Sequence, residues 1–247
     1  MNGNGNNELQ DFDPIGQDLG LFDTPDLNLD DLDFMAPSSL AVETRYTKPR
    51  RARLEPNFVC YDNAVKMARE LRLDFGQRID AFVSGSFIFG DFIEAYLTTQ
   101  NACAKKMVIS TLSLSQNNVD SLATLLEKGY IEELALVISV YFWGNERFSL
   151  IPYIYRNLDI DDRFQLAVAD IHTKTVHFET LGGRKIIIHG SANLRSSGNI
   201  EQFTMEENPE LYGFYDEHFS RVIDKFKTIN KAVRATEAWD AFTRKRF

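Results

Sequence analysis

The sequence has little cysteine, and its two cysteines, Cys60 and Cys103, lie far apart and in no CxxC pattern. This excludes a disulfide framework, gives no support for a zinc ribbon and fits a reducing compartment. The chain also lacks an initial basic segment followed by an apolar one, so we expect no signal peptide. The longest apolar run, 134–143, is interrupted only by Ser139 and is far shorter than the roughly 20 residues that span a membrane. We therefore expect a soluble, cytoplasmic protein without a membrane partner.

Lysine and arginine are absent from residues 1–43, which contain ten of the 36 acidic residues. The rest of the chain has 27 basic and 26 acidic residues, so the net charge of −9 belongs to this tail. Its Asn-, Asp- and Gly-rich composition is typical of disorder. We expect a disordered acidic tail over 1–43, a basic linker over 44–56, and a folded domain with a C-terminal helix over 57–247.

Two stretches of the tail predict a protein partner. QDLGLF, at 17–22, resembles peptides that bind bacterial sliding clamps, which place Gln, Leu and Phe at short spacing. LNLDDLDF, at 27–34, is an acidic and hydrophobic segment of the kind that folds on a partner surface. A competing hypothesis is that the tail mimics DNA and shields the basic segment 45–53 until a partner arrives.

Strand-like and helix-like segments alternate after residue 57, which predicts an α/β sheet with parallel neighbours. Strands are expected over 77–86, 105–115, 132–143 and 163–171, and helices over 61–73, 87–99, 116–129, 146–158 and 209–229. In such sheets functional groups gather beyond the carboxyl ends of the strands. Polar stretches follow three of these strands at 84–86, 112–115 and 141–147.

The stretch 171–203 carries three of the four histidines and a strong two-residue turn signal, Gly182-Gly183. If the two glycines form the loop of a hairpin, His172 faces Asn193 and Lys174 faces Ser191. Facing residues project to the same side of a sheet, so these four side chains would converge on one face. An imidazole can attack phosphorus, and Lys and Asn can stabilise the charge on its oxygens. The register therefore predicts phosphate chemistry.

The same register argues against a metal site. His177 is an odd number of residues from His172 and points to the other face, whereas His189 shares the face of His172 but lies opposite Val176. Histidines divided in this way do not form a zinc site without a bulge, and no cysteine is near. We therefore expect no metal or other cofactor, and we interpret His177, His189 and His218 as surface or packing residues.

These residues resemble the signature of the phospholipase D superfamily. The family pattern is HxK, four residues, Asp, about six residues, GSxN and a later Glu, and the matching positions here are His172, Lys174, Ser191, Asn193 and Glu201. The stretches SGSFIFGDFIEA, SLSQNNVDSLATLL and GSANLRSSGNIEQF also resemble single-motif members encoded in phages and mobile elements. The resemblance covers about 57–230 and implies a mixed sheet flanked by helices.

Two positions depart from the family pattern. Glu179 stands where the family has Asp, and its parity turns it away from His172, so we expect a structural contact with Arg184 or His177. Ten residues, rather than about six, separate Glu179 from Gly190. An even extension of a hairpin keeps every side chain on its face, so the active constellation is expected to survive.

The resemblance implies a metal-independent phosphodiesterase. His172 would attack phosphorus, a second histidine would protonate the leaving oxygen, Lys174 and Asn193 would hold phosphate oxygens, Ser191 would support the site or donate to phosphate, and Glu201 would orient an imidazole. Because one motif copy is present, the resemblance implies a homodimer with a shared site, and the alternative donor within one chain would be His189 or His177.

The substrate is the more open part of this expectation. Small single-copy members of the family are mostly nucleases, and the basic segments 45–53 and 225–246 could follow a DNA backbone. The alternatives are a catalytically silent nucleic-acid-binding module and a phage assembly or adaptor protein on the same fold.

Overall fold

The computed structural model describes residues 63–83, 87–195 and 199–231, all within the second of the two units of the chain, 40–247. The predicted tail (1–43), the predicted linker (44–56), the polar stretch 84–86 and the basic residues after 231 lie outside the described residues. The domain boundaries therefore stay a prediction. None of the described helices is long and apolar enough to cross a membrane.

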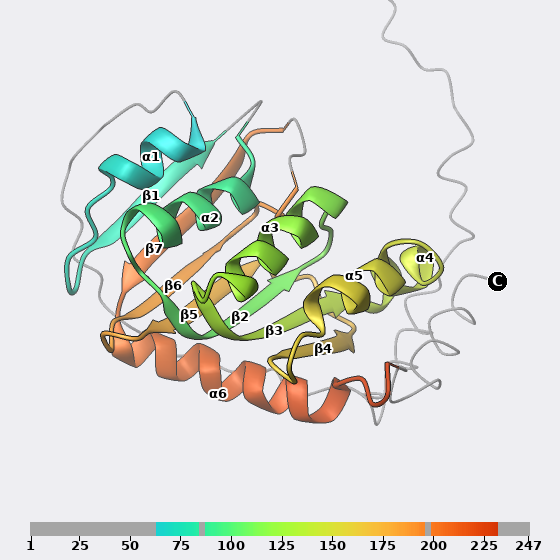
Figure 1. Cartoon of the computed structure of the whole chain (residues 1–247). Coiled ribbons are helices and arrows are strands. Elements are labelled where there is room, and N and C mark those ends of the chain that lie inside the picture. Colours follow the sequence, from blue (N-terminus) through green and yellow to red (C-terminus); the bar gives the residue numbers. More distant parts are fainter. Residues whose placement is uncertain (1–62, 84–86, 196–198, 232–247) are drawn as a thin grey trace, which may run out of the picture. The chain divides into compact units, whose positions relative to one another are not determined.

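Helices and strands alternate along most of the described chain (Figure 1). Their order is α1 (Ala64–Glu70), β1 (Arg78–Val83), α2 (Phe89–Thr99), β2 (Ala104–Thr111), α3 (Gln116–Glu127), β3 (Ile131–Ser139), α4 (Val140–Glu146), α5 (Leu150–Leu158), β4 (Phe164–Ala169), β5 (Thr175–Thr180), β6 (Lys185–Gly190), β7 (Glu201–Glu207) and α6 (Pro209–Phe226).

The strands form one mixed sheet in the order β1-β7-β6-β5-β2-β3-β4. The pairs β2–β3 and β3–β4 are parallel, and every other neighbouring pair is antiparallel. This confirms the expected mixed sheet flanked by helices. The carboxyl ends of β1, β2, β3, β4 and β6 and the amino ends of β5 and β7 consequently share one edge, which we call the carboxyl edge.

The sheet is covered on both faces (Figure 1). The helices α1 to α5 pack on one face over a large apolar core, in which Phe92, Phe178 and Phe203 are among the largest fully buried side chains. The long helix α6 lies along the other face and contacts β4, β5 and β6. It buries Phe219 and Val222 against a smaller apolar cluster. We call this second side the α6 face.

Local sequence signals account for most of the element ends. Ser115 accepts a hydrogen bond from the Asn118 backbone N–H and caps α3, and Gly129 follows the helix with a positive φ of 74°. Pro209 occupies the first turn of α6, where its missing N–H costs no helical hydrogen bond. These helices begin and end close to where the sequence predicts.

One predicted strand ends early, and one strand was not predicted. The strand expected over 132–143 ends at Ser139, because the Ser139 side chain accepts a hydrogen bond from Phe142 N–H at 3.0 Å and starts α4. The strand β7 was not predicted, since its acidic residues Glu206 and Glu207 obscure the strand pattern, yet it lies between β1 and β6. Both changes affect the carboxyl edge, where α4 and β7 begin.

The register of the β5–β6 hairpin also differs from the expected one. Thr180 faces Arg184, with the Thr180 N–H donating to the Arg184 carbonyl at 2.8 Å, so the loop has three residues, 181–183. Only Gly183 takes a positive φ, 81°, as expected for a three-residue loop that ends in the left-handed region. A two-residue turn of type I′ or II′ would need a positive φ at its first central residue, Gly182, which does not have one. Each facing pair is consequently shifted by one residue.

Candidate active site

All five residues of the proposed constellation lie at the carboxyl edge. His172 and Lys174 occupy the loop that leads into β5, Ser191 and Asn193 follow β6, and Glu201 begins β7. The strands β5, β6 and β7 are neighbours in the sheet. The sheet topology therefore brings together segments that are separated by up to 29 positions in the sequence.

The facing pairs that the sequence predicted are wrong at this edge. The Gly190 N–H donates to the Lys174 carbonyl at 3.1 Å, so Lys174 lies opposite Gly190 rather than Ser191. The ladder of strand pairs starts at Thr175, and His172 lies before it. The constellation is therefore assembled by loops that are anchored to neighbouring strands, not by the hairpin ladder itself.

The loop before β5 is anchored through Thr173. Its Oγ1 lies 2.6 Å from the Ser110 Oγ at the end of β2, and the Ser110 hydroxyl is also 3.2 Å from the Thr173 carbonyl oxygen. Ser110 shares the α6 face with Val108, two residues before it. Since alternate residues of an extended segment point to opposite sides, His172 and Lys174 are directed away from the α6 face.

His172 and Lys174 are available to a ligand. His172 is exposed and Lys174 is half-buried. Within residues 63–83, 87–195 and 199–231, neither side chain makes a hydrogen bond or an ion pair. An imidazole and an ammonium group two residues apart, open to solvent and without a partner in the described chain, form a suitable pair for an anion.

Asn193 is fixed by the end of β2. Its Oδ1 accepts a hydrogen bond from the Leu112 backbone N–H at 3.2 Å and lies 3.4 Å from the Thr111 hydroxyl, whose single proton has a shorter bond, of 3.0 Å, to the Ser113 carbonyl. Since β5 lies between β6 and β2, the chain after Gly190 must cross the start of β5 to reach this position. The backbone donor at Oδ1 sets the orientation of the amide, so its Nδ2 hydrogens are directed to other acceptors.

Ser191 holds Glu201. The Ser191 hydroxyl accepts a hydrogen bond from the Gln202 backbone N–H at 3.0 Å and donates its proton to the Glu201 carboxylate. The Ser191 N–H also donates to the Gln202 carbonyl at 2.9 Å. The approach is close enough that a Cβ at Gly190 would lie 2.1 Å from the Gln202 carbonyl oxygen. Glycine is thus required where β6 meets β7.

The remaining histidines lie on the α6 face. His189 faces Thr175 and not Val176, so it shares the face of His177 and not that of His172, contrary to the expectation. His177 is fully buried against the rings of Tyr212 and Phe219, and burial lowers its pKa to about 4. No group of three or more His, Cys, Asp or Glu residues in the described part of the chain is placed to share a metal ion.

Glu179 lies on the α6 face, with Lys106 and Lys185 as its neighbours in the strand register. The parity argument that turns it away from His172 and Lys174 agrees with this register. No hydrogen bond or ion pair joins Glu179 to Arg184 or His177 within the described residues, and the Arg184 guanidinium instead donates to the Glu207 carboxylate at 2.6 and 2.9 Å.

The sequence argument missed the residues that anchor the loops. Thr173 lies inside the HxK motif, between His172 and Lys174. The alternation of side chains therefore already indicates that it points to the other face of the sheet. Ser110 and Thr111 end a buried strand, where a polar residue needs a hydrogen-bond partner. These two signals together could have identified β2 as the strand that carries the anchors.

Comparisons with known proteins find solved structures to which the chain is similar. No family model matches it, and no curated protein matches it. The chain is similar to NucT from Helicobacter pylori (TM-score 0.46, 12% identity, covering 62% of this chain and 100% of that one). It is also similar to Nuc from Salmonella typhimurium, a phospholipase D family member (TM-score 0.45, 14% identity, covering 61% of this chain and 97% of that one). A third similar structure is phosphatidylserine synthase from Haemophilus influenzae (TM-score 0.46, 15% identity, covering 68% of this chain and 44% of that one). With identities this low, these structures assign no role to any residue of this chain.

Proposed function

We propose that the protein is a metal-independent phosphodiesterase that cleaves nucleic acid, most simply DNA, through a phosphohistidine intermediate. One observation carries the proposal. His172 is exposed, Lys174 is half-buried, and neither side chain has a hydrogen bond or ion pair within the described residues. They lie beside a segment that presents the amide nitrogen of Asn193. A nucleophile and two donors for phosphate oxygens thus lie at one edge of the sheet.

In the first step a ring nitrogen of His172 attacks phosphorus. A P–N bond forms, the P–O bond to the leaving alcohol breaks, and a protonated second imidazole gives its proton to the leaving oxygen. Lys174 and the Nδ2 of Asn193 donate to the non-bridging oxygens, on which negative charge accumulates. The two donors differ, because Lys174 supplies full charge whereas the Asn193 amide supplies a fixed direction.

In the second step water replaces the histidine. The second imidazole, now neutral, takes a proton from water as the water oxygen attacks phosphorus, and the P–N bond breaks. His172 is released and the product is a phosphate monoester. His177 and His189 lie on the α6 face, so the second imidazole is assigned to His172 of another copy in a two-fold dimer.

Ser191 and Glu201 serve as positioning residues in this scheme. The hydroxyl proton of Ser191 is already donated to the Glu201 carboxylate, so Ser191 is better suited to fix this acid than to bind phosphate. A carboxylate held in this way can accept a hydrogen bond from an imidazole N–H and set its tautomer. Nucleic acid is preferred as the substrate because the sequence has basic segments at 45–53 and 225–246.

Hydrolysis of bis(p-nitrophenyl) phosphate and of single- and double-stranded DNA, measured in EDTA, tests the proposal. We expect His172→Asn to lower the rate at least about 1,000-fold, as loss of a nucleophile does elsewhere. His218→Asn, on α6, is the matched control and should keep the activity. Labelled diester should leave an acid-labile, alkali-stable label on the unchanged protein and none on His172→Asn. Equal rates for the two variants would remove His172 as the nucleophile, and binding of DNA without cleavage would favour a silent binding module.

Mixed dimers test the shared site. The unchanged chain and the His172→Asn chain are refolded together in varied ratios. If each site needs His172 from both copies, the activity follows the square of the fraction of unchanged chain. A linear dependence, or a monomer in sedimentation at the working concentration, would show that one chain carries a complete site.

A further inference from the structure

A short helix leaves the carboxyl edge directly beside the candidate site. Ser139 ends β3 and caps α4, so the helix starts where the strand stops. Only β2 lies between β3 and β5 in the sheet. Two strand spacings of about 4.8 Å therefore separate the end of β3 from the start of β5, which follows His172 and Lys174.

Exposed aromatic residues lie at the start of α4 and just after its end. Phe142 is buried, whereas Tyr141 is 50% exposed and Phe148 is 84% exposed. Arg147 is the C-cap residue of α4 (φ −61°, ψ −22°), and Phe148 follows it in the turn after the helix. At a helical rise of 1.5 Å per residue, Tyr141 and Phe148 are separated by roughly 10 Å along the chain. We call Tyr141, the exposed Asn145 and Phe148 the aromatic strip.

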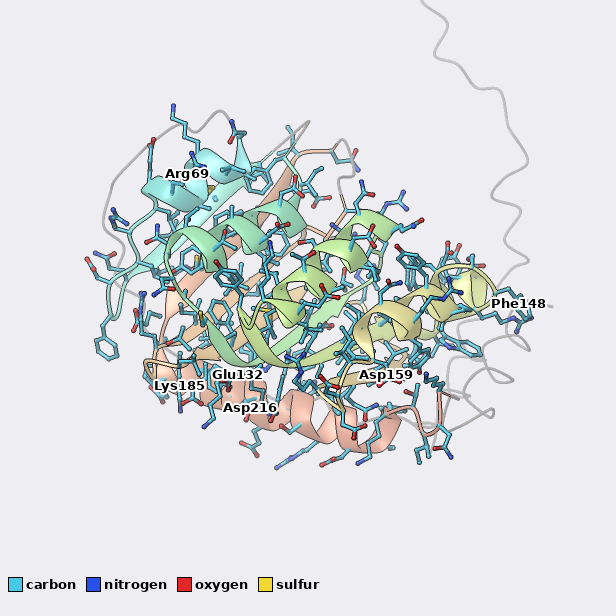
Figure 2. The ribbon with its side chains drawn as sticks, in the orientation of Figure 1. Arg69, Glu132, Phe148, Asp159, Lys185 and Asp216 are labelled. Atoms are coloured by element: carbon cyan, nitrogen blue, oxygen red, sulfur yellow. The ribbon has the colours of Figure 1, made fainter. Side chains whose placement is uncertain are left out.

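The chemistry of the aromatic strip suits nucleic-acid bases. The guanidinium carbon of Arg147 lies 4.7 Å from the centroid of the Phe148 ring, and most of this ring still faces solvent. Figure 2 shows Phe148 at the outer end of α4 and α5. Aromatic rings and guanidinium planes are surfaces on which unpaired bases stack, and an Asn amide can hydrogen bond to the edge of a base.

We propose that the aromatic strip binds the unpaired bases of a single-stranded nucleic acid whose backbone reaches His172. The proposal rests on the function proposed above, and it adds a substrate class and a base-binding subsite. In a duplex the bases are paired and stacked on one another, so their faces are not open to Tyr141 and Phe148. The strip therefore favours single strands over double strands.

Binding to labelled oligothymidylate tests the strip without depending on cleavage, because every protein in the test also carries His172→Asn. We expect Phe148→Ala to weaken binding about tenfold and Tyr141→Ala with Phe148→Ala to weaken it further. Phe75→Ala is the matched control, since Phe75 is 74% exposed but lies in the turn before β1, at the opposite edge of the sheet. It should bind like its parent.

An abasic oligomer of the same length separates base stacking from attraction to the backbone. It keeps the phosphates, so Phe148→Ala should bind it as well as the parent protein does. The salt dependence of binding should also be the same in both proteins, because no phosphate contact is removed. Equal binding of oligothymidylate by the Phe148→Ala and Phe75→Ala proteins would overturn the proposal. The proposal would also be overturned if the Phe148→Ala protein sedimented as a monomer while its parent sedimented as a dimer. That result would identify the strip as a contact between two copies of the chain.

The catalytic readout separates this inference from the proposed function. In the chain with His172 intact, Phe148→Ala should raise KM for single-stranded DNA and leave the hydrolysis of bis(p-nitrophenyl) phosphate unchanged. If the unchanged protein cleaves no diester while Phe148→Ala still weakens binding, the phosphodiesterase proposal fails and the base-binding strip stands. If the protein cleaves DNA and both phenylalanine variants behave alike, the strip fails and the phosphodiesterase stands.

Discussion

The carboxyl edge and the α6 face hold the same types of residue in opposite states. At the edge His172 is exposed, and Lys174 has no hydrogen bond or ion pair within the described residues. On the α6 face His177 is fully buried, and the Lys106 Nζ lies 2.8 Å from the Asp216 Oδ1. Figure 2 labels Asp216 on α6. Access to solvent and pairing, rather than residue type, thus decide which imidazole and which ammonium group can meet a substrate.

The buried histidine is held neutral by its surroundings. The ring of His177 packs against Tyr212, Tyr215 and Phe219, and neither ring nitrogen has a hydrogen-bond partner in the described structure. Burial lowers its pKa to about 4, while the nearby Asp216 acts in the opposite direction. A neutral imidazole in an apolar environment suits packing and cannot serve as the protonated acid of the proposed reaction at neutral pH.

The largest expected effect separates the two lysines. Lys174→Met should lower the rate of diester hydrolysis about 100- to 1,000-fold, because a donor to the charged phosphate oxygens is lost. Lys106→Met should leave this rate unchanged and lower the free energy of unfolding by at most about 1 kcal/mol, since its ion pair is partly exposed. Steady-state kinetics and urea unfolding of both variants measure the contrast. Equal activity of the two proteins would contradict the role of Lys174.

The next effect compares two glycines. Gly190→Ala should cost about 3 kcal/mol of unfolding free energy, because the new Cβ would lie within 3 Å of the backbone of Gln202 and Phe203. Gly213→Ala, on α6, meets nothing within 4 Å and should gain up to about 1 kcal/mol from helix propensity. Thermal unfolding of both proteins checks the difference. If Gly190→Ala proves as stable as Gly213→Ala, β6 and β7 are not as close as described.

The smallest effect is the pH dependence that His177 adds to stability. Its folded pKa of about 4 is below the usual 6.5, so the unfolded chain binds the proton first as the pH falls. Its contribution is complete above pH 6.5 and is lost between about 6.5 and 4, which amounts to about 2 kcal/mol between pH 7 and pH 5. His177→Phe should lack this loss while hydrolysis persists. Parallel curves of unfolding free energy against pH for the two proteins would contradict the burial of the His177 ring away from water.

The hairpin shows how far sequence reasoning reaches. Gly182-Gly183 correctly located the turn between β5 and β6, but a two-residue and a three-residue loop have nearly the same sequence signal. The three-residue loop shifts every facing pair by one residue from the predicted register, so His189 lies on the face of the sheet opposite to the predicted one. The proposed constellation nevertheless stays at one edge, because Thr173 and Asn193 are anchored to the end of β2 rather than to the hairpin register.

The segments that begin at the carboxyl edge were harder to predict. The run that ends in Tyr141 to Trp143 is apolar enough for a strand, and only the capping hydrogen bond of Ser139 converts it to a helix. The strand β7 carries four acidic or amide side chains, and one of its acids, Glu207, is satisfied by Arg184, 23 positions away. Long-range pairing of this kind leaves no periodic signal in the local sequence.

By itself the sequence determined the hairpin segment that carries His172, Lys174 and Ser191, the alternation that separates His172 from His177, and the apolar stretches that form the core. These follow from patterns that repeat every two or about 3.6 residues, which the chain displays locally. The tertiary structure alone decided the position of β7, the register of the hairpin and the orientation of the Asn193 amide. Each of these depends on hydrogen bonds between segments that are distant in the sequence, and such bonds are formed only when the whole sheet is in place.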